Sequence, residues 1–152
     1  MEITALGRYK LSFDSNNFSV VCPLGRAKFS GLATSKLPKL YVASVDGQPI
    51  YVGITKQSIR NRLRLGWAAT GKAGYYGYAW RHKFSAADFD IWCHTNPNPE
   101  GSCLDIETVE AELVFLIRQA GQWPLFQTEI HFHPSTEVHR AIARQIADSY
   151  GI

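Results

Sequence analysis

The chain has 152 residues, a length that predicts one domain with a core large enough to fold without disulfide staples. Its 16 Lys and Arg residues and 13 Asp and Glu residues give a net charge of +3, which permits a polyanionic partner without requiring one. No apolar run approaches the roughly 18 residues of a membrane span, and the N-terminus lacks the apolar stretch of a signal peptide. Three widely spaced cysteines without a CxxC pair favour a reduced, cytoplasmic protein.

The N-terminal part of the chain is predicted to be rich in β-structure. Residues 9–13 (YKLSF) and 17–22 (NFSVVC) are short runs with aromatic and β-branched residues, and the DSNN between them favours a turn. The stretch that follows holds turn residues and several cations. We therefore expect residues 1–38 to form a β-rich extension packed on a main unit of residues 39–152.

The main unit opens with a predicted β-hairpin. Two apolar runs, residues 40–45 (LYVASV) and 49–54 (PIYVGI), flank an Asp-Gly dipeptide at 46–47, which is a strong short-range hairpin signal. Each run holds one tyrosine, Tyr41 or Tyr51. Tyrosines in a hairpin usually pack in the core with a satisfied hydroxyl, so alone they indicate structure rather than chemistry.

Residues 55–67 are predicted to form a helix that Ser58 could cap. Its apolar side chains recur at every fourth position and form one packing face: Ile59, Leu63 and Trp67. Arg60 and Arg64 share a second face. At about 100° per residue, Arg62 projects roughly 160° away from Arg60, on the other flank of the apolar stripe. One arginine of this helix is thus expected to point away from the other two.

The remaining elements follow from the same patterns of apolar residues. Glycines and aromatic residues after the first helix indicate a loop that leads into a short helix. The expected elements beyond it are a strand at 88–96, a helix at 105–120 ended by Gly121, a strand at 126–134 and a last helix that Ser135 opens.

Several short motifs follow one another along residues 39 to 130. Tyr41 lies in KLY, YVG follows at 51–53, Arg62 lies on the next helix, and EAELV at 110–114 and PLFQ at 124–127 come later. In this order the motifs, spread over residues 39 to 130, resemble those of the GIY-YIG nuclease family.

The chain departs from the family pattern at particular positions. KLY stands where the family has GIY, and Gln127 stands where the family has asparagine. Many members carry a histidine or tyrosine four residues after the arginine, where this chain has Gly66.

The resemblance implies an α+β domain with a central antiparallel sheet of three or more strands flanked by helices. It also implies a metal-dependent endonuclease that hydrolyses DNA phosphodiester bonds. In that case Tyr41 and Tyr51 position or deprotonate water, Arg62 stabilises the transition state, and Glu110 binds Mg²⁺ or Mn²⁺. The residue types suit this chemistry, because a guanidinium fork matches phosphate oxygens and Mg²⁺ needs few protein ligands.

Alternatives remain open at this stage. Glu107 and Glu112 compete with Glu110 for the metal; Glu107 can share a helix face with Glu110, whereas Glu112 points elsewhere. A catalytically inactive, GIY-YIG-like nucleic-acid-binding module is the alternative function. His131 and His133 lie on one predicted strand face, but no third ligand at useful spacing accompanies them, so we expect them to be structural.

A set of polar side chains could contact the nucleic acid, although for any single cation a solvated surface position is the simpler interpretation. These candidates are Lys56, Arg60, Arg64, Lys72, Arg81, Lys83 and Gln127. Four aromatic residues could equally stack on bases or fill the core: Tyr75, Tyr76, Tyr78 and Trp80. DNA is the expected partner, with RNA not excluded, and a homodimer or a partner protein could supply specificity.

Overall fold

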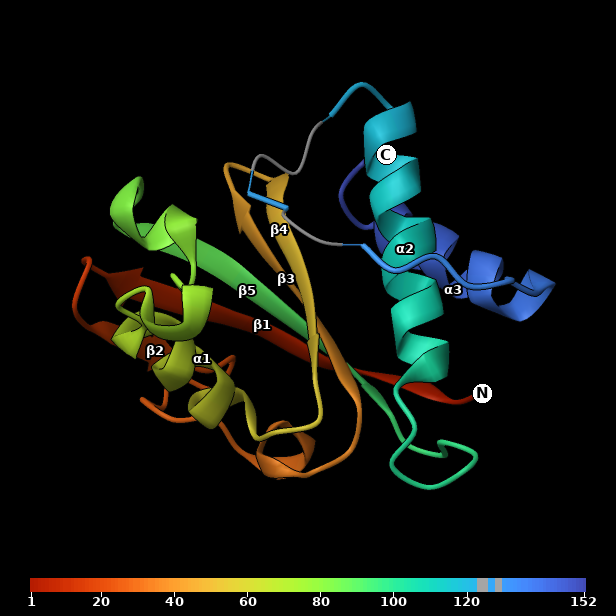
Figure 1. Ribbon diagram of the computed structural model, residues 1–152, viewed down its shortest axis with the longest axis horizontal. Coiled ribbons are helices and arrows are strands. Elements are labelled where there is room, and N and C mark those ends of the chain that lie inside the picture. Colours follow the sequence, from red (N-terminus) through yellow and green to blue (C-terminus); the bar gives the residue numbers. More distant parts are fainter. Residues whose placement is uncertain (123–125, 128–129) are drawn as a thin grey trace.

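The computed structural model describes residues 1–122, 126–127 and 130–152 (Figure 1). In the described part, five strands and three α-helices alternate with short 3-10 turns. Their bounds are β1 (Ile3–Phe13), β2 (Phe18–Val21), η1 (Gly31–Thr34), β3 (Lys39–Val45), β4 (Gln48–Thr55), α1 (Ile59–Ala68), η2 (Lys72–Gly74), η3 (Ala79–His82), β5 (Ala86–His94), α2 (Leu104–Gln119) and α3 (Glu137–Asp148).

The strands form one antiparallel sheet in the order β2-β1-β5-β3-β4. Helices cover both of its faces, with α1 on one side and α2 and α3 on the other (Figure 1). Alternation along β3 explains the two cores: Tyr41 packs toward α1 with Leu63 and Phe89, whereas Val42 packs toward α2 with Leu113. The expected α+β fold, a central antiparallel sheet flanked by helices, is therefore confirmed.

The predicted hairpin is confirmed as β3 and β4. Asp46 and Gly47 both adopt positive φ, 52° and 77°, which a two-residue type I′ turn requires. The ladder is irregular between Ala43 and Ser44, and on the far side of that shift Ala43 pairs with Tyr51.

The N-terminal segment joins the same sheet. β1 begins at Ile3, well before the predicted start near residue 9, and it pairs with β5 as well as with β2. Alternate residues of its second half are buried, so local periodicity revealed this half, whereas the first half is a strand because it pairs with the end of β5. Residues 1–38 thus contribute two strands to the sheet of residues 39–152.

Helix boundaries follow capping chemistry. The Ser58 hydroxyl accepts a hydrogen bond from the Asn61 amide at 3.3 Å, as predicted, but α1 starts at Ile59 because Thr55 still belongs to β4. The last helix begins one residue later than expected. Thr136 caps it, and the ring of His139 completes the box in the place of a carboxylate.

The strand predicted at 126–134 is wrong for the described residues of that stretch, which have no strand structure; residues 128 and 129 lie outside the description. Phe126 donates its amide to the carbonyl of Ile50 at 3.1 Å, and the Gln127 side-chain oxygen accepts from the Val52 amide at 2.9 Å. The amide of Val52 in β4 thus bonds the Gln127 side chain instead of the backbone of a neighbouring strand. The alternating pattern of residues 126–134 therefore does not add a strand to the sheet among the described residues.

The cysteines and the helices bear on the predictions of a reduced protein and of no membrane span. All three cysteines are free, with Cys22 and Cys93 buried and Cys103 partly exposed. Among the described residues, no helix is long and apolar enough to cross a membrane.

Candidate active site at the edge of the sheet

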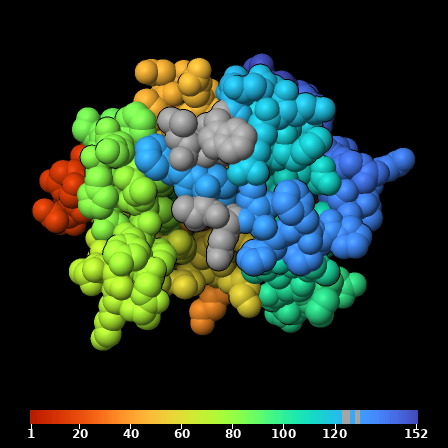
Figure 2. Space-filling model, turned by 45° about the horizontal axis from the view of Figure 1, so that its top comes forward, coloured from red at the N-terminus to blue at the C-terminus, as the bar shows by residue number. Residues whose placement is uncertain are grey.

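A cleft of about 660 Å³ opens over the edge strand β4. Because β4 is the last strand of the sheet, α1 on one face and α2 on the other can both reach around it. Figure 2 shows the yellow-green segment after α1 and the blue segment after α2 on the same face of the molecule. The lining includes four predicted site residues, Tyr51, Arg62, Glu110 and Gln127.

Tyr41 lies beneath this cleft rather than in its wall. The side chain is completely buried, and its hydroxyl is 2.8 Å from the hydroxyl of Tyr78. In the β3–β4 ladder Tyr41 is paired with Gly53, and its ring passes over that glycine. The glycine of the YVG motif is thus explained by packing, because any larger residue would occupy the space of the phenol.

Replacing Gly53 with alanine is expected to destabilise the fold by about 1–3 kcal/mol through overpacking. An ideal Cβ at this position would lie 2.5 Å from both Cζ and the hydroxyl oxygen of Tyr41. Urea denaturation of Gly53→Ala, Tyr41→Leu and the double variant measures the effect. The two changes should be less than additive, since the shorter side chain removes the clash; strictly additive losses would contradict this explanation.

Tyr51 lies at the surface of the cleft, with its ring centroid 6.1 Å from that of Tyr41. Burial raises the pKa of Tyr51 well above its usual value, and the nearby guanidinium of Arg62 only partly offsets this. The hydroxyl therefore keeps its proton at neutral pH. It is suited to donate or relay a hydrogen bond rather than to act as a preformed base.

Arg62 is held in place by aromatic rings. Its Nη1 donates to the Tyr75 hydroxyl at 2.7 Å, and its guanidinium carbon lies 4.9 Å from the centre of the Tyr78 ring. Burial opposes the charge, but the phenols of Tyr41 and Tyr78 favour it, so the pKa of Arg62 is raised. No salt bridge to a carboxylate is present within the described part of the chain, which leaves the charge available to a ligand.

Tyr78 approaches Arg62 because α1 has a glycine at position 66. A Cβ added at Gly66 would lie 2.1 Å from Cε2 and 2.3 Å from Cδ2 of the Tyr78 ring, so only glycine allows this approach. Gly66 thus places no side chain at this position of α1, and the phenol of Tyr78, from a later segment, occupies the space beside it. Sequence spacing could not show this, because the two residues come together only in the tertiary structure.

The three candidate glutamates of α2 differ in their position relative to the cleft and in their partners. Glu110 and Glu107 line the cleft, whereas Glu112 does not. Glu107 pairs with the Nε2 of His133 at 2.9 Å, while Glu110 has no hydrogen bond or salt bridge in the described ranges. Burial, reinforced by the neighbouring charge of Glu107, raises the pKa of Glu110 to about 8.

The Glu110 carboxyl has the properties of a ligand for a magnesium or manganese ion. No group of three or more His, Cys, Asp or Glu side chains is placed to hold a metal ion among residues 1–122, 126–127 and 130–152. Mg²⁺, however, keeps several waters and often uses one or two carboxylates. The buried carboxyl of Glu110, which has no hydrogen-bond or salt-bridge partner among the residues that the structure describes, lines the cleft and meets that requirement.

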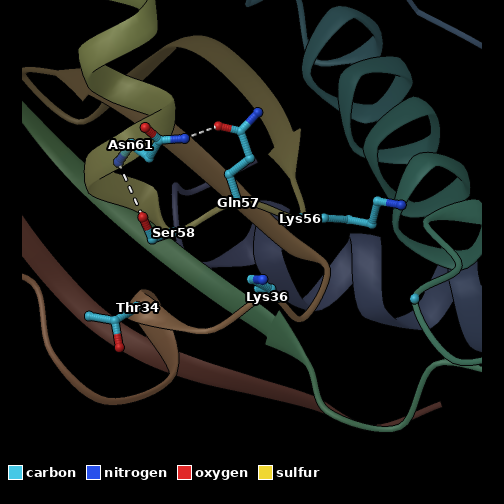
Figure 3. A pocket seen from close by; sticks show the side chains of 7 residues that line it. Thr34, Lys36, Lys56, Gln57, Ser58 and Asn61 are labelled. Carbon is cyan, nitrogen blue, oxygen red and sulfur yellow. Dashed lines mark hydrogen bonds between the residues drawn. The ribbon is translucent and has the colours of Figure 1, made fainter.

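The predicted cations are not gathered in the cleft. Lys56 lines a separate hollow of about 580 Å³ at the start of α1, together with Lys36 (Figure 3). Arg60 and Arg64 line a third hollow, between α1 and the turn that joins β1 to β2, so they point away from Arg62 as expected. The exposed Lys72 and Lys83 follow α1 in the chain and line none of these hollows, and Arg81 is buried.

The cleft also contains residues that the sequence left open or assigned to structure. His131 lines it although it was expected to be structural, and Tyr75 and Tyr76 form part of its wall. Glu107 was recognisable from its i, i+3 spacing to Glu110, whereas nothing in the sequence separated Tyr75 and Tyr76 from Tyr78 and Trp80, which are buried. Comparisons with protein-family models, with curated proteins and with solved structures found no match to this chain.

Proposed function

We propose that the protein is a metal-dependent endonuclease that hydrolyses phosphodiester bonds of DNA. The observation that supports the proposal is that Tyr51, Arg62 and Glu110, from β4, α1 and α2, line one cleft. Residues far apart in the sequence are thus brought together in the combination that such chemistry uses: a guanidinium, a phenol and a carboxylate.

Each residue has a role that its surroundings suit. The guanidinium of Arg62, charged and without a carboxylate partner in the described residues, binds the non-bridging oxygens of the phosphate and stabilises the charge that develops there. The protonated phenol of Tyr51 orients the attacking water or relays its proton. Glu110 would hold Mg²⁺ or Mn²⁺, which when bound supplies an acidic water and neutralises charge on the phosphate.

Tyr41 is assigned a positioning role in this proposal. Its buried hydroxyl contacts Tyr78, whose ring lies against the guanidinium of Arg62. A chain of contacts therefore runs from the first motif tyrosine to the arginine. Loss of the Tyr41 hydroxyl would act through the placement of Arg62, without contact to substrate.

Plasmid nicking tests the proposal. Supercoiled DNA is incubated with the protein in Mg²⁺ or Mn²⁺, and wild type is compared with Glu110→Gln and Glu112→Gln. We expect cleavage by wild type and by Glu112→Gln, and a loss of about 100-fold or more in Glu110→Gln, because the amide cannot supply the anionic ligand. Absence of wild-type cleavage across both metals, duplex and single-stranded substrates would refute the proposal. Activity lost in Glu112→Gln but kept in Glu110→Gln would reassign the metal ligand.

A second candidate is a module that binds nucleic acid without cutting it. It is favoured by one observation: with a pKa of about 8, Glu110 is largely protonated at neutral pH and must release a proton before it can bind a cation. The same experiment separates the candidates, since a pure binder shifts the DNA in a gel but leaves it intact at every pH and metal concentration.

A further inference from the structure

The segment of residues 71–77 forms an aromatic rim along the cleft. Tyr75 and Tyr76 both line the cleft, yet they remain 41% and 72% exposed. Their near neighbours behave differently: Tyr78 and Trp80 are 2% and 0% exposed and fill the core. Of the four aromatic residues in this stretch, two are therefore explained by packing and two present their rings to solvent beside a charged site.

Contacts with α1 hold the rim in shape. The buried guanidinium of Arg81 donates from Nη1 to the carbonyls of Gly66 and Tyr76, and from Nη2 to that of Ala69 at 2.9 Å. The Gly71 amide donates to the carbonyl of Tyr75 at 2.8 Å. The Arg81 guanidinium thus joins the Tyr76 end of the segment to the C-terminal end of the helix that carries Arg62, and the Gly71 bond closes the segment on itself.

The ring of Tyr76 has a defined place within the rim. It lies over Gly71, where an added Cβ would come within 2.5 Å of its Cε1 atom. A ring that is positioned before binding loses little conformational entropy when a flat ligand stacks on it. The outer part of the ring stays exposed, so the rim offers a prepared aromatic surface.

The charge next to the rim indicates what that surface would hold. The Tyr75 hydroxyl accepts a hydrogen bond from Arg62 at 2.7 Å, so the rim directly adjoins the guanidinium that would bind a phosphate. A polynucleotide places a planar base and an anionic phosphate in the same unit. Bases in a duplex are stacked on one another, whereas unpaired bases expose faces that aromatic side chains can cover.

We propose that Tyr76, supported by Tyr75, stacks on an unpaired base next to the phosphate held by Arg62. The preferred substrate then contains single-stranded nucleotides at the cleavage point, as in a bulge, a gap or a free strand. The base-binding part of this inference stands on the rim itself, and only the statement about cleavage rests on the proposed nuclease function.

Binding without cleavage is measured first, in EDTA, with a single-stranded oligonucleotide that carries 2-aminopurine. Wild type should quench the fluorescence of the probe, and Tyr76→Leu should bind about 5- to 100-fold more weakly, the range expected for one lost base–aromatic stack. Tyr76→Trp should preserve binding. Phe115→Leu, which changes an exposed aromatic residue of α2 that does not line the cleft, serves as the matched control and should resemble wild type.

Cleavage is then compared on three substrates of the same sequence: a full duplex, a duplex with an unpaired bulge and a single strand. Faster cutting of the unpaired substrates by wild type, with that preference lost in Tyr76→Leu, supports the inference. If wild type binds and quenches as expected but cuts nothing, base stacking stands and the nuclease proposal fails. If wild type cuts the full duplex equally well and Tyr76→Leu changes neither binding nor preference, the nuclease proposal stands and the inference is overturned. The inference is also overturned if wild type binds no polynucleotide, even if the rim binds a protein instead.

Discussion

Replacing Arg62 with alanine is expected to lower the rate of DNA cleavage by about 100- to 1,000-fold, the usual cost of removing one preorganised donor to a transition-state oxyanion. Arg62 is the cation that lines the cleft with Tyr51 and Glu110 in the described residues. The loss should fall mainly on kcat, because the charge on the phosphate oxygens grows in the transition state. Single-turnover cleavage of a labelled duplex measures it.

Two further variants sharpen this test. Arg62→Lys keeps the charge but loses the planar fork, so its rate should lie between those of wild type and Arg62→Ala. Arg26→Ala removes one exposed positive charge that does not line the cleft and should leave the rate unchanged. Thermal unfolding of Arg62→Ala tests for a folding defect, since the substitution removes both the bond to Tyr75 and the contact with the Tyr78 ring. A reduction of less than tenfold in a folded variant would remove Arg62 from the catalytic set.

Replacing Glu110 with glutamine is expected to stabilise the protein at high pH by up to about 5 kcal/mol, with little effect at pH 4. The pKa of Glu110 is raised from 4.5 to about 8, mainly by burial. At pH 4 the carboxyl is mostly protonated in both the folded and unfolded states. Between those two pKa values only the unfolded chain releases the proton, so wild-type stability falls as pH rises and levels off above pH 8. Glutamine has no proton to release and avoids this loss.

Urea denaturation at pH 4, 6, 8 and 9 measures the difference between the two proteins. Addition of Mg²⁺ at pH 9 should raise the Tm of wild type, because an ion that binds only the folded carboxylate stabilises the folded state, and should leave Glu110→Gln unchanged. For the same reason, cleavage should increase with pH up to about 8 as the proton leaves Glu110. Parallel stability curves for the two proteins would show that the Glu110 carboxyl is not buried as described. Equal responses of the two proteins to Mg²⁺ would show that Glu110 is not a metal ligand.

Local interactions account for what could be predicted. The turn at Asp46 and Gly47, the Ser58 cap and the end of α2 near Gly121 each depend on residues within a few positions of one another. The different direction of Arg62 also followed from helix geometry alone. Arg62 is two positions away from Arg60 and from Arg64, and two steps of about 100° place it on roughly the opposite side of the helix from them. These features carried the prediction of individual elements and of the direction of Arg62, whereas the arrangement of the elements into an α+β fold was expected from the resemblance to the GIY-YIG nuclease family.

Features that depend on long-range contacts could not be predicted. The segment at 126–134 alternates like a strand, yet Gln127 caps β4 with its side chain, and no local pattern reports which group an edge strand will meet. The sequence likewise gave no sign that Tyr78 would reach Gly66, since Arg81 and the packing of Trp80 determine the path of that segment.

Tyr41 and Tyr51 show the division most clearly. The sequence by itself determined that both lie in one hairpin, because turn chemistry and short-range pairing suffice for that. Only the tertiary structure decided that Tyr41 is buried under Gly53 while Tyr51 meets Arg62 and Glu110 in a cleft. The reason is the place of β4 at the edge of the sheet, which lets helices from both faces meet there, and that place depends on the pairing of strands far apart in the chain.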